Sequence, residues 1–136
     1  MRLALFTFSI LFFAACQEPA TVQKKVVIDP NNTSEMALQM RDMYEQLADI
    51  KLKLEAGDSL SSEQLAFALI HELEATDESF RKKGLEAMSI AYANAVEQFN
   101  EKPDKKAYQT LVNNCVSCHQ SLCPGPLERI DNLIIE

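Results

Sequence analysis

Residues 103–126, "PDKKAYQTLVNNCVSCHQSLCPGP", decide the fold that we expect for this chain. Pro103 is compatible with a helix start, and the next proline or glycine is Pro124. Between them, residues at steps of three and four share one helical face. They are Tyr108, Leu111, Val112, Cys115, Cys118, His119 and Leu122. Because Pro124, Gly125 and Pro126 end the pattern, the sequence predicts one amphipathic helix with thiols and an imidazole on its buried face.

A first helix is predicted upstream, from about residue 32 to Gly57. Asn32 and Glu35 form its start signal, and Gly57 with Asp58 ends it. Its apolar seam again follows steps of four and three. The seam contains Met36, Met40, Met43, Leu47, Ile50 and Leu54.

Two further helices are predicted between these. Ser61 and Gln64 form a capping box, and Leu65, Leu69 and Leu73 give a helix over about 61–75 its stripe. A helix over about 77–100 is expected to turn Phe80, Met88, Ala91, Tyr92, Ala95 and Phe99 inward. Four such helices joined by short loops predict an all-α, antiparallel four-helix bundle over residues 35–136.

Composition restricts the functional classes. The chain has 136 residues, 47% of them hydrophobic, which is enough for one core and short for two domains. Its formal net charge is −7, so it offers no basic surface to neutralise phosphates. We therefore expect no nucleic-acid partner.

The N-terminus has the pattern of an export signal. Arg2 precedes the apolar stretch Leu3 to Phe13, which is short for a membrane span, and Ala14-Ala15-Cys16 follows. This resembles a bacterial lipoprotein signal over residues 1–15, with the lipid on Cys16. A plain secretory signal cut nearby is the alternative.

Residues 16–34 have no sustained period and contain two prolines, so they predict a tether. A lipid on Cys16 would then be the protein's only membrane anchor. Gln17 in place of aspartate gives no inner-membrane retention signal, so the expected location is periplasmic, on the outer membrane.

Cys115-Val116-Ser117-Cys118-His119 is the C-x-x-C-H pattern of c-type haem attachment. Thiols one helical turn apart can add to the two vinyl groups of a haem, and the adjacent histidine can bind the iron as proximal ligand. The sequence thus predicts haem c as cofactor, held by Cys115, Cys118 and His119. The export signal agrees, because haem is joined to such motifs outside the cytoplasm.

The sequence supports other chemistries of these residues less well. A thioredoxin-like dithiol would need a βαβ setting, which the helical pattern does not offer. Zinc bound by Cys115, Cys118, Cys123 and a histidine lacks a second ligand pair at normal spacing. A structural disulfide and a chance motif also stay open, and Cys123 receives no role.

A four-helix chain with this motif near its C-terminus is similar to the cytochrome c′ family, which includes the low-spin cytochromes c-556. The likeness covers about residues 34–122. It implies a haem inside the bundle, attached to the last helix, with a first-helix side chain on its distal face. The family often carries an arginine near the haem propionates, one turn before that distal residue. Met36 occupies this position if Met40 is the distal residue, and Arg41 lies nearby.

The sixth iron ligand is the open question. Met40 is the predicted distal ligand, with Met43 and then Met36 as alternatives, and ordinary core packing is the competing interpretation. His71, the only other histidine, is expected to be a satisfied or exposed side chain, and iron ligation from the second helix is the alternative.

Two functions therefore remain. Histidine and methionine ligation predicts single-electron transfer between periplasmic redox proteins. A five-coordinate iron would instead bind nitric oxide or carbon monoxide. No base, nucleophile or substrate pocket is evident, so we expect no enzyme. A homodimer stays open, as does a docking role for the basic clusters 81–83 and 105–106.

Overall fold

The structure is a computed structural model, and it describes residues 33–135. Within this range the chain is all-α, with no strand. The elements are α1 (Glu35–Ala56), the 3₁₀ turns η1 (Ile70–Glu72) and η2 (Glu78–Phe80), α2 (Leu85–Glu101), α3 (Lys105–Leu122) and the short α4 (Leu127–Asp131). The predicted signal segment, Cys16 and most of the tether lie outside the described residues.

None of the helices in residues 33–135 is long and apolar enough to cross a bilayer.

Helix α1 has the predicted extent, with a different start residue. Its N-cap is Ser34 rather than Asn32, and the Ser34 hydroxyl accepts a hydrogen bond from the Ala37 N–H at 3.2 Å. The same hydroxyl lies 2.8 Å from that of Thr76, so Ser34 is buried in the fold. Gly57 ends the helix at φ 75°, a left-handed conformation that favours glycine.

The predicted helix over residues 61–75 is wrong. Apart from two short 3₁₀ turns, residues 57–84 form turns and irregular, largely extended chain. From residue 64 to 69 exposure alternates: Leu65 is buried, Phe67 and Leu69 are partly buried, and the residues between them are exposed. This two-residue period is the signature of extended backbone. The spacing of Leu65 and Leu69 fits both a helical period and a two-residue period, and the helical interpretation was wrong.

Side-chain amides satisfy the backbone of this segment. Asn100 of α2 pairs with both polar groups of Leu65: its Oδ1 accepts from the Leu65 N–H at 2.8 Å, and its Nδ2 donates to the Leu65 carbonyl at 2.8 Å. Gln39 of α1 does the same for Ala68, at 3.0 and 2.8 Å. Side chains from α1 and α2 thus supply backbone hydrogen bonds that a helix would make within itself.

Helix α2 begins at Leu85, eight residues after the predicted start. Asp77 instead accepts a hydrogen bond from the Ser79 N–H and begins η2, which leaves Phe80 half-exposed. Gly84 takes φ 99° immediately before α2, a conformation that breaks the helical path. Ala91 is exposed, whereas Tyr92, Ala95 and Phe99 are buried as expected.

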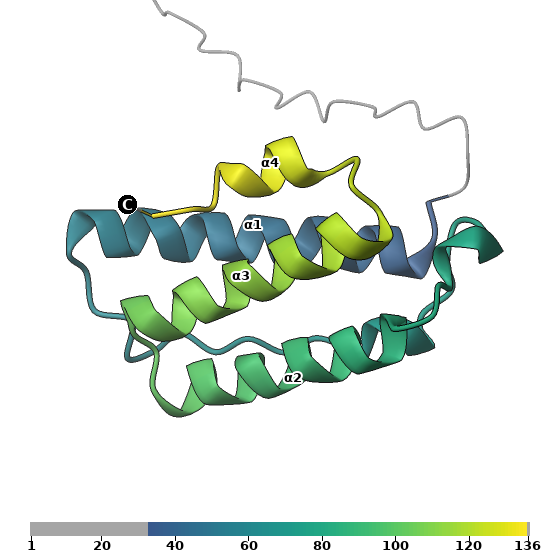
Figure 1. Cartoon of the computed structure of the whole chain (residues 1–136). Coiled ribbons are helices and arrows are strands. Elements are labelled where there is room, and N and C mark those ends of the chain that lie inside the picture. The colour runs from purple at the N-terminus through teal and green to yellow at the C-terminus, as the bar shows by residue number, and fades with distance from the viewer. Residues whose placement is uncertain (1–32, 136) are drawn as a thin grey trace, which may run out of the picture.

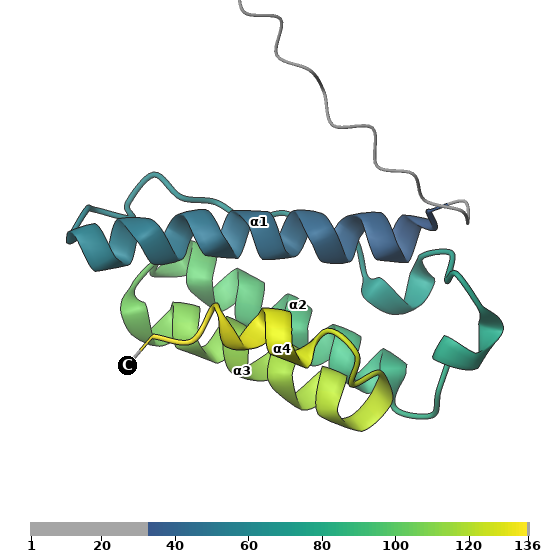
Figure 2. The ribbon, with the colours of Figure 1, turned by 90° about the horizontal axis from the view of Figure 1, so that it is seen from above.

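Helices α2 and α3 pack along each other, and α1 runs along one side of this pair with sparser contact to α3 (Figures 1 and 2). The core between them is dominated by side chains that are at most 1% exposed. They are Leu47, Ile50, Phe99, Tyr108 and Leu111. The bundle therefore has three long helices, and α4 is a fourth, short one that lies beside α1 and α3 in Figure 1.

Helix α4 and the residues after it are tied to the bundle by polar contacts. The Tyr108 hydroxyl donates to the buried Leu133 carbonyl at 2.7 Å. Lys51 of α1 donates to the carbonyls of Asn132 and Ile134 at 2.9 and 3.0 Å. Leu133 is 2% exposed, so this C-terminal stretch closes the core on the side of α1.

Candidate cofactor site

A cavity of about 590 Å³ lies between α1 and α3. This volume is within the range of small-molecule and cofactor sites. Its α1 wall contains Met36, Met40, Met43, Tyr44 and Leu47, and its α3 wall contains Cys115, Cys118, His119 and Leu122. Residues of the segment 57–84, residues 123–126 and α4 also line it, together with Ser34, Leu85 and Leu133.

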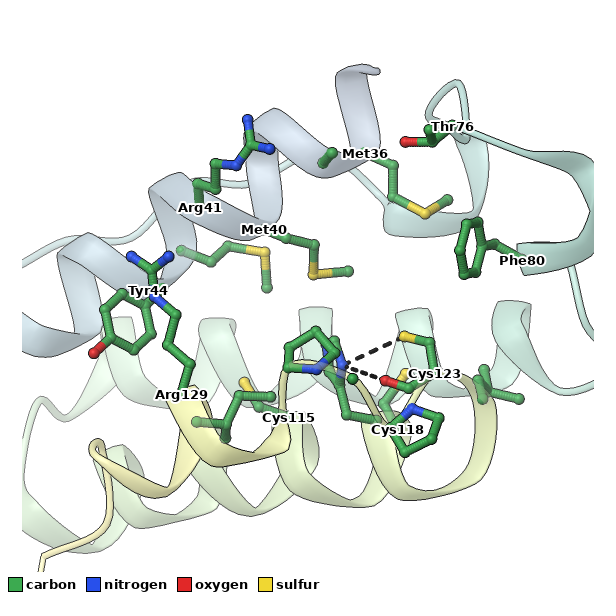
Figure 3. A pocket seen from close by; sticks show the side chains of 18 of the residues that line it. Met36, Met40, Arg41, Tyr44, Thr76, Phe80, Cys115, Cys118, Cys123 and Arg129 are labelled. Atoms are coloured by element: carbon green, nitrogen blue, oxygen red, sulfur yellow. Dashed lines mark hydrogen bonds between the residues drawn. The ribbon is translucent and has the colours of Figure 1, made fainter. Parts of the chain in front are cut away.

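The α3 wall brings together the reactive side chains that the sequence singled out. Asp104 caps α3 by accepting from the Ala107 N–H at 2.8 Å, and Cys115, Cys118 and His119 follow on the inner face. Figure 3 shows Cys115 and Cys118 on the wall opposite the α1 methionines. Helical geometry places residues three apart on consecutive turns, so the two thiols are spaced along one side of the cavity.

His119 is held in one tautomer by the end of α3. Its Nδ1 lies 3.0 Å from the carbonyl oxygen of Cys123, and since a carbonyl only accepts, Nδ1 carries the proton. The unprotonated Nε2 is then available as a ligand atom. Burial to 7% exposure lowers the pKa of His119, although the Cys123 hydrogen bond opposes this shift. The neutral imidazole is the form that binds metals.

Cys115, Cys118 and Cys123 are free thiols in this structure. Burial, followed by the charge of Cys118, raises the pKa of Cys115 to about 12. Burial also raises the pKa of Cys118 and of Cys123. Dithiol oxidoreductases need a lowered thiol pKa, so this environment disfavours the thioredoxin-like alternative.

Residues 33–135 contain no group of three or more histidine, cysteine, aspartate or glutamate side chains that could hold a metal ion. The zinc alternative requires such a group.

The α1 wall consists largely of thioethers. Met36, Met40 and Met43 all line the cavity, as the four-three spacing predicts. Met43 is buried at 4% exposure, and Met36 and Met40 are half-buried. In Figure 3 the side chains of Met36 and Met40 extend from α1 into the cavity, and Met40 lies nearer its middle.

The cavity wall carries positive charge and no negative charge. Arg41, Lys82 and Arg129 line it, and none of the aspartates or glutamates in residues 33–135 does. This contrasts with a chain that has 20 acidic and 13 basic residues. Apart from these three cations and His119, the walls are mainly apolar or sulfur-containing.

Arg129 was missed by sequence reasoning because α4 was not predicted. The sequence holds a weak signal for this helix: Pro126 stands at its start, and Leu127, Ile130 and Leu133 follow at steps of three. The helix has only five residues. Such a short pattern does not stand out without the core that it covers.

His71 has a structural role outside this site, and so does Arg81, whereas Lys82 of the same basic cluster lines the cavity. The Nδ1 of His71 lies 3.0 Å from the Ser89 hydroxyl, and His71 is not part of the cavity wall. Arg81 donates to the carbonyls of His71 and Leu73 at 2.9 and 2.8 Å, and Lys82 donates to the Leu122 carbonyl. Part of the cluster 81–83 therefore stabilises the fold.

No protein family, no curated protein and no solved structure matches this chain. Fold and site together define a small all-helical domain with a largely apolar, cation-lined cavity.

Proposed function

We propose that this protein is an exported c-type cytochrome that transfers single electrons through a haem attached to Cys115 and Cys118. One observation carries the proposal: two thiols one turn apart, an imidazole and a row of thioethers converge on one cavity. The C-x-x-C-H pattern alone could arise by chance. A chance motif would have no reason to lie on a cavity wall opposite methionines, as this motif does.

The residues present fit a haem in size, polarity and donor set. A volume of about 590 Å³ with mainly apolar walls suits a flat, largely apolar group. Cys115 and Cys118 would form the thioethers, and Nε2 of His119 would bind the iron. The cations of the wall would balance carboxylates at the edge of the cofactor.

When bound in this way, haem supplies a one-electron Fe(III)/Fe(II) couple. The chain's own residues set its environment. The Cys123 carbonyl orients the His119 ring, and buried apolar side chains such as Leu47 and Leu122 exclude water. A thioether from α1 would occupy the opposite side and keep small ligands away.

A place in the cytochrome c′ and c-556 family is part of this proposal. The all-helical fold, with the motif on a long helix that packs in the bundle, supports it. The largely extended segment 57–84 departs from the four long helices of that family. The relation is therefore proposed for the haem-binding helices α1 and α3 first.

Export and anchoring complete the proposal. Residues 1–15 would direct the chain out of the cytoplasm, and a lipid on Cys16 would hold it on the outer membrane, where redox proteins of the periplasm would be its partners. Mass spectrometry of the mature N-terminus tests this part. A lipidated Cys16 is expected, and a terminus beyond residue 16 would contradict it.

Substitution of Met40 tests the electron-transfer function against gas binding. The wild-type protein should have a low-spin optical spectrum and should not bind carbon monoxide readily. Met40→Ala should vacate the sixth position, which gives a high-spin spectrum, a lower reduction potential and carbon monoxide binding. Met36→Ala and Met43→Ala are the matched controls and should change these properties much less.

A wild-type protein that is already high-spin and binds carbon monoxide would contradict electron transfer and favour the gas-binding alternative. If Met43→Ala rather than Met40→Ala vacated the site, the function would stand and the ligand would be reassigned.

A further inference from the structure

The three cations on the cavity wall differ in whether their N–H donors already make hydrogen bonds within the protein. Lys82 donates to the Leu122 carbonyl at the end of α3. Arg41 lies 3.5 Å from the Thr33 hydroxyl and has a further interaction. Arg129 instead places its guanidinium carbon 4.1 Å from the centroid of the Tyr44 ring.

A cation–π contact uses the charge of a guanidinium and none of its five N–H donors. Within residues 33–135, no carboxylate pairs with Arg129. The Tyr44 ring thus holds the guanidinium of Arg129 at the cavity edge, between α4 and α1, with its donors available (Figure 3). A planar fork of donors in a fixed position is the preferred partner of a carboxylate.

We propose that Arg129, positioned by Tyr44, is the anion-binding group of this cavity and holds the propionate carboxylates of the haem. This inference rests on the proposed function. It assigns propionate binding to α4 rather than to the first helix. On the first helix, the position one turn before Met40 is occupied by Met36 and not by an arginine. The cavity would thereby select a porphyrin with free carboxylates over an esterified one.

In Figure 3 Arg129 and Tyr44 lie at one end of the cavity, whereas Cys123 and Phe80 lie at the other end. No acidic side chain of residues 33–135 lines the wall to compete for the guanidinium. Because Arg129 is exposed, water and salt weaken the interaction without abolishing it.

The test uses iron mesoporphyrin, whose ethyl groups cannot be attached to cysteine, and its dimethyl ester. Each is titrated optically into the haem-free form of the full mature chain. The wild-type chain should bind the dicarboxylate about tenfold more tightly than the ester, as one charge-assisted hydrogen bond gives. The preference should shrink at high salt.

Arg129→Gln should remove most of this preference by weakening the dicarboxylate complex, while ester binding stays unchanged. Arg129→Lys keeps the charge without the planar fork and should retain part of the preference for the dicarboxylate. Lys106→Gln, outside the cavity, makes the same change in net charge and should have no effect. Circular dichroism confirms that the variants keep the helical fold.

An Arg129→Gln variant that folds and keeps the full preference would overturn this inference alone. A preference abolished by Arg41→Gln instead would also overturn it. Failure of both porphyrins to bind the wild-type chain would overturn the inference together with the haem site itself.

Discussion

Helix α3 and the segment of residues 57–84 pack against the same core, yet their backbones are stabilised in different ways. The backbone groups of α3 pair mainly within the helix; Asp104 caps its first turn, and its last carbonyl, that of Leu122, accepts from Lys82. Leu65 and Ala68 of the segment 57–84 pair with amide side chains of α2 and α1. The conformation of α3 is therefore local in origin, whereas that of the segment depends on tertiary contacts.

This difference bears on the site. Cys115, Cys118 and His119 keep their relative positions through helical geometry alone, so the reactive wall is preorganised. Thr76 and Lys82, which close one end of the cavity, belong to the segment that tertiary contacts hold. Changes in the segment should therefore alter the closure of the cavity more readily than the spacing of its ligands.

Proline substitutions test the contrast most strongly. Asn113 is exposed in the middle of α3, and Asn113→Pro should destabilise the haem-free protein by about 3 kcal/mol or more, because it removes a helical hydrogen bond and creates a clash. Ala66 is exposed in extended chain, and Ala66→Pro should cost less than about 1 kcal/mol. Urea unfolding of both variants measures the difference.

Equal losses in the two variants would mean that residues 61–75 are helical after all. Asn113→Ala and Ala66→Gly separate loss of the side chain from the effect of the proline ring.

The same contrast explains what the sequence could predict. The extents of α1 and α3, and the convergence of Met40, Cys115 and His119, follow from patterns that each helix carries in its own residues. The path of residues 61–75 does not, because Asn100 lies 35 positions from Leu65 and Gln39 lies 29 from Ala68. Helix α4, with Arg129, is stabilised by the core that it covers rather than by its own length.

The two amides should differ in their contribution to stability. Asn100→Ala leaves the N–H and the carbonyl of Leu65 unpaired next to the core, which should cost about 2–3 kcal/mol. Gln39→Ala breaks the equivalent pair at Ala68, where the bonds are exposed and water can replace them, so the cost should stay below about 1 kcal/mol.

Urea unfolding gives both values. A Gln39→Ala variant as destabilised as Asn100→Ala would show that burial does not distinguish the two pairs. Asn100→Asp keeps the acceptor and loses the donor, so its free energy of unfolding should lie between those of wild type and Asn100→Ala.

The smallest expected effect concerns two aspartate caps. The hydrogen bond from the Ala107 N–H lowers the pKa of Asp104 below its ordinary value of 3.8, and a bond from Ser79 does the same for Asp77. A lowered carboxyl pKa contributes stability that is present above pH 3.8 and is lost as the pH falls through the folded pKa.

Asp104→Asn should therefore flatten the fall in global stability below pH 4, because it removes the titrating group at the start of a long helix. Asp77→Asn should affect only the local turn η2. Thermal unfolding between pH 2 and 7 measures both. A steeper acid dependence in Asp104→Asn would contradict the sign of the shift.

The most direct test of the central claim is the intact mass of the denatured protein. Wild-type protein from a host with haem-attachment machinery should carry the added mass of one haem, retained in acidified organic solvent. The variant with Cys115→Ala and Cys118→Ala should lose that mass, whereas Cys123→Ala should keep it. A wild-type chain with no added mass, or one whose haem is extracted by the solvent, would contradict covalent attachment on α3.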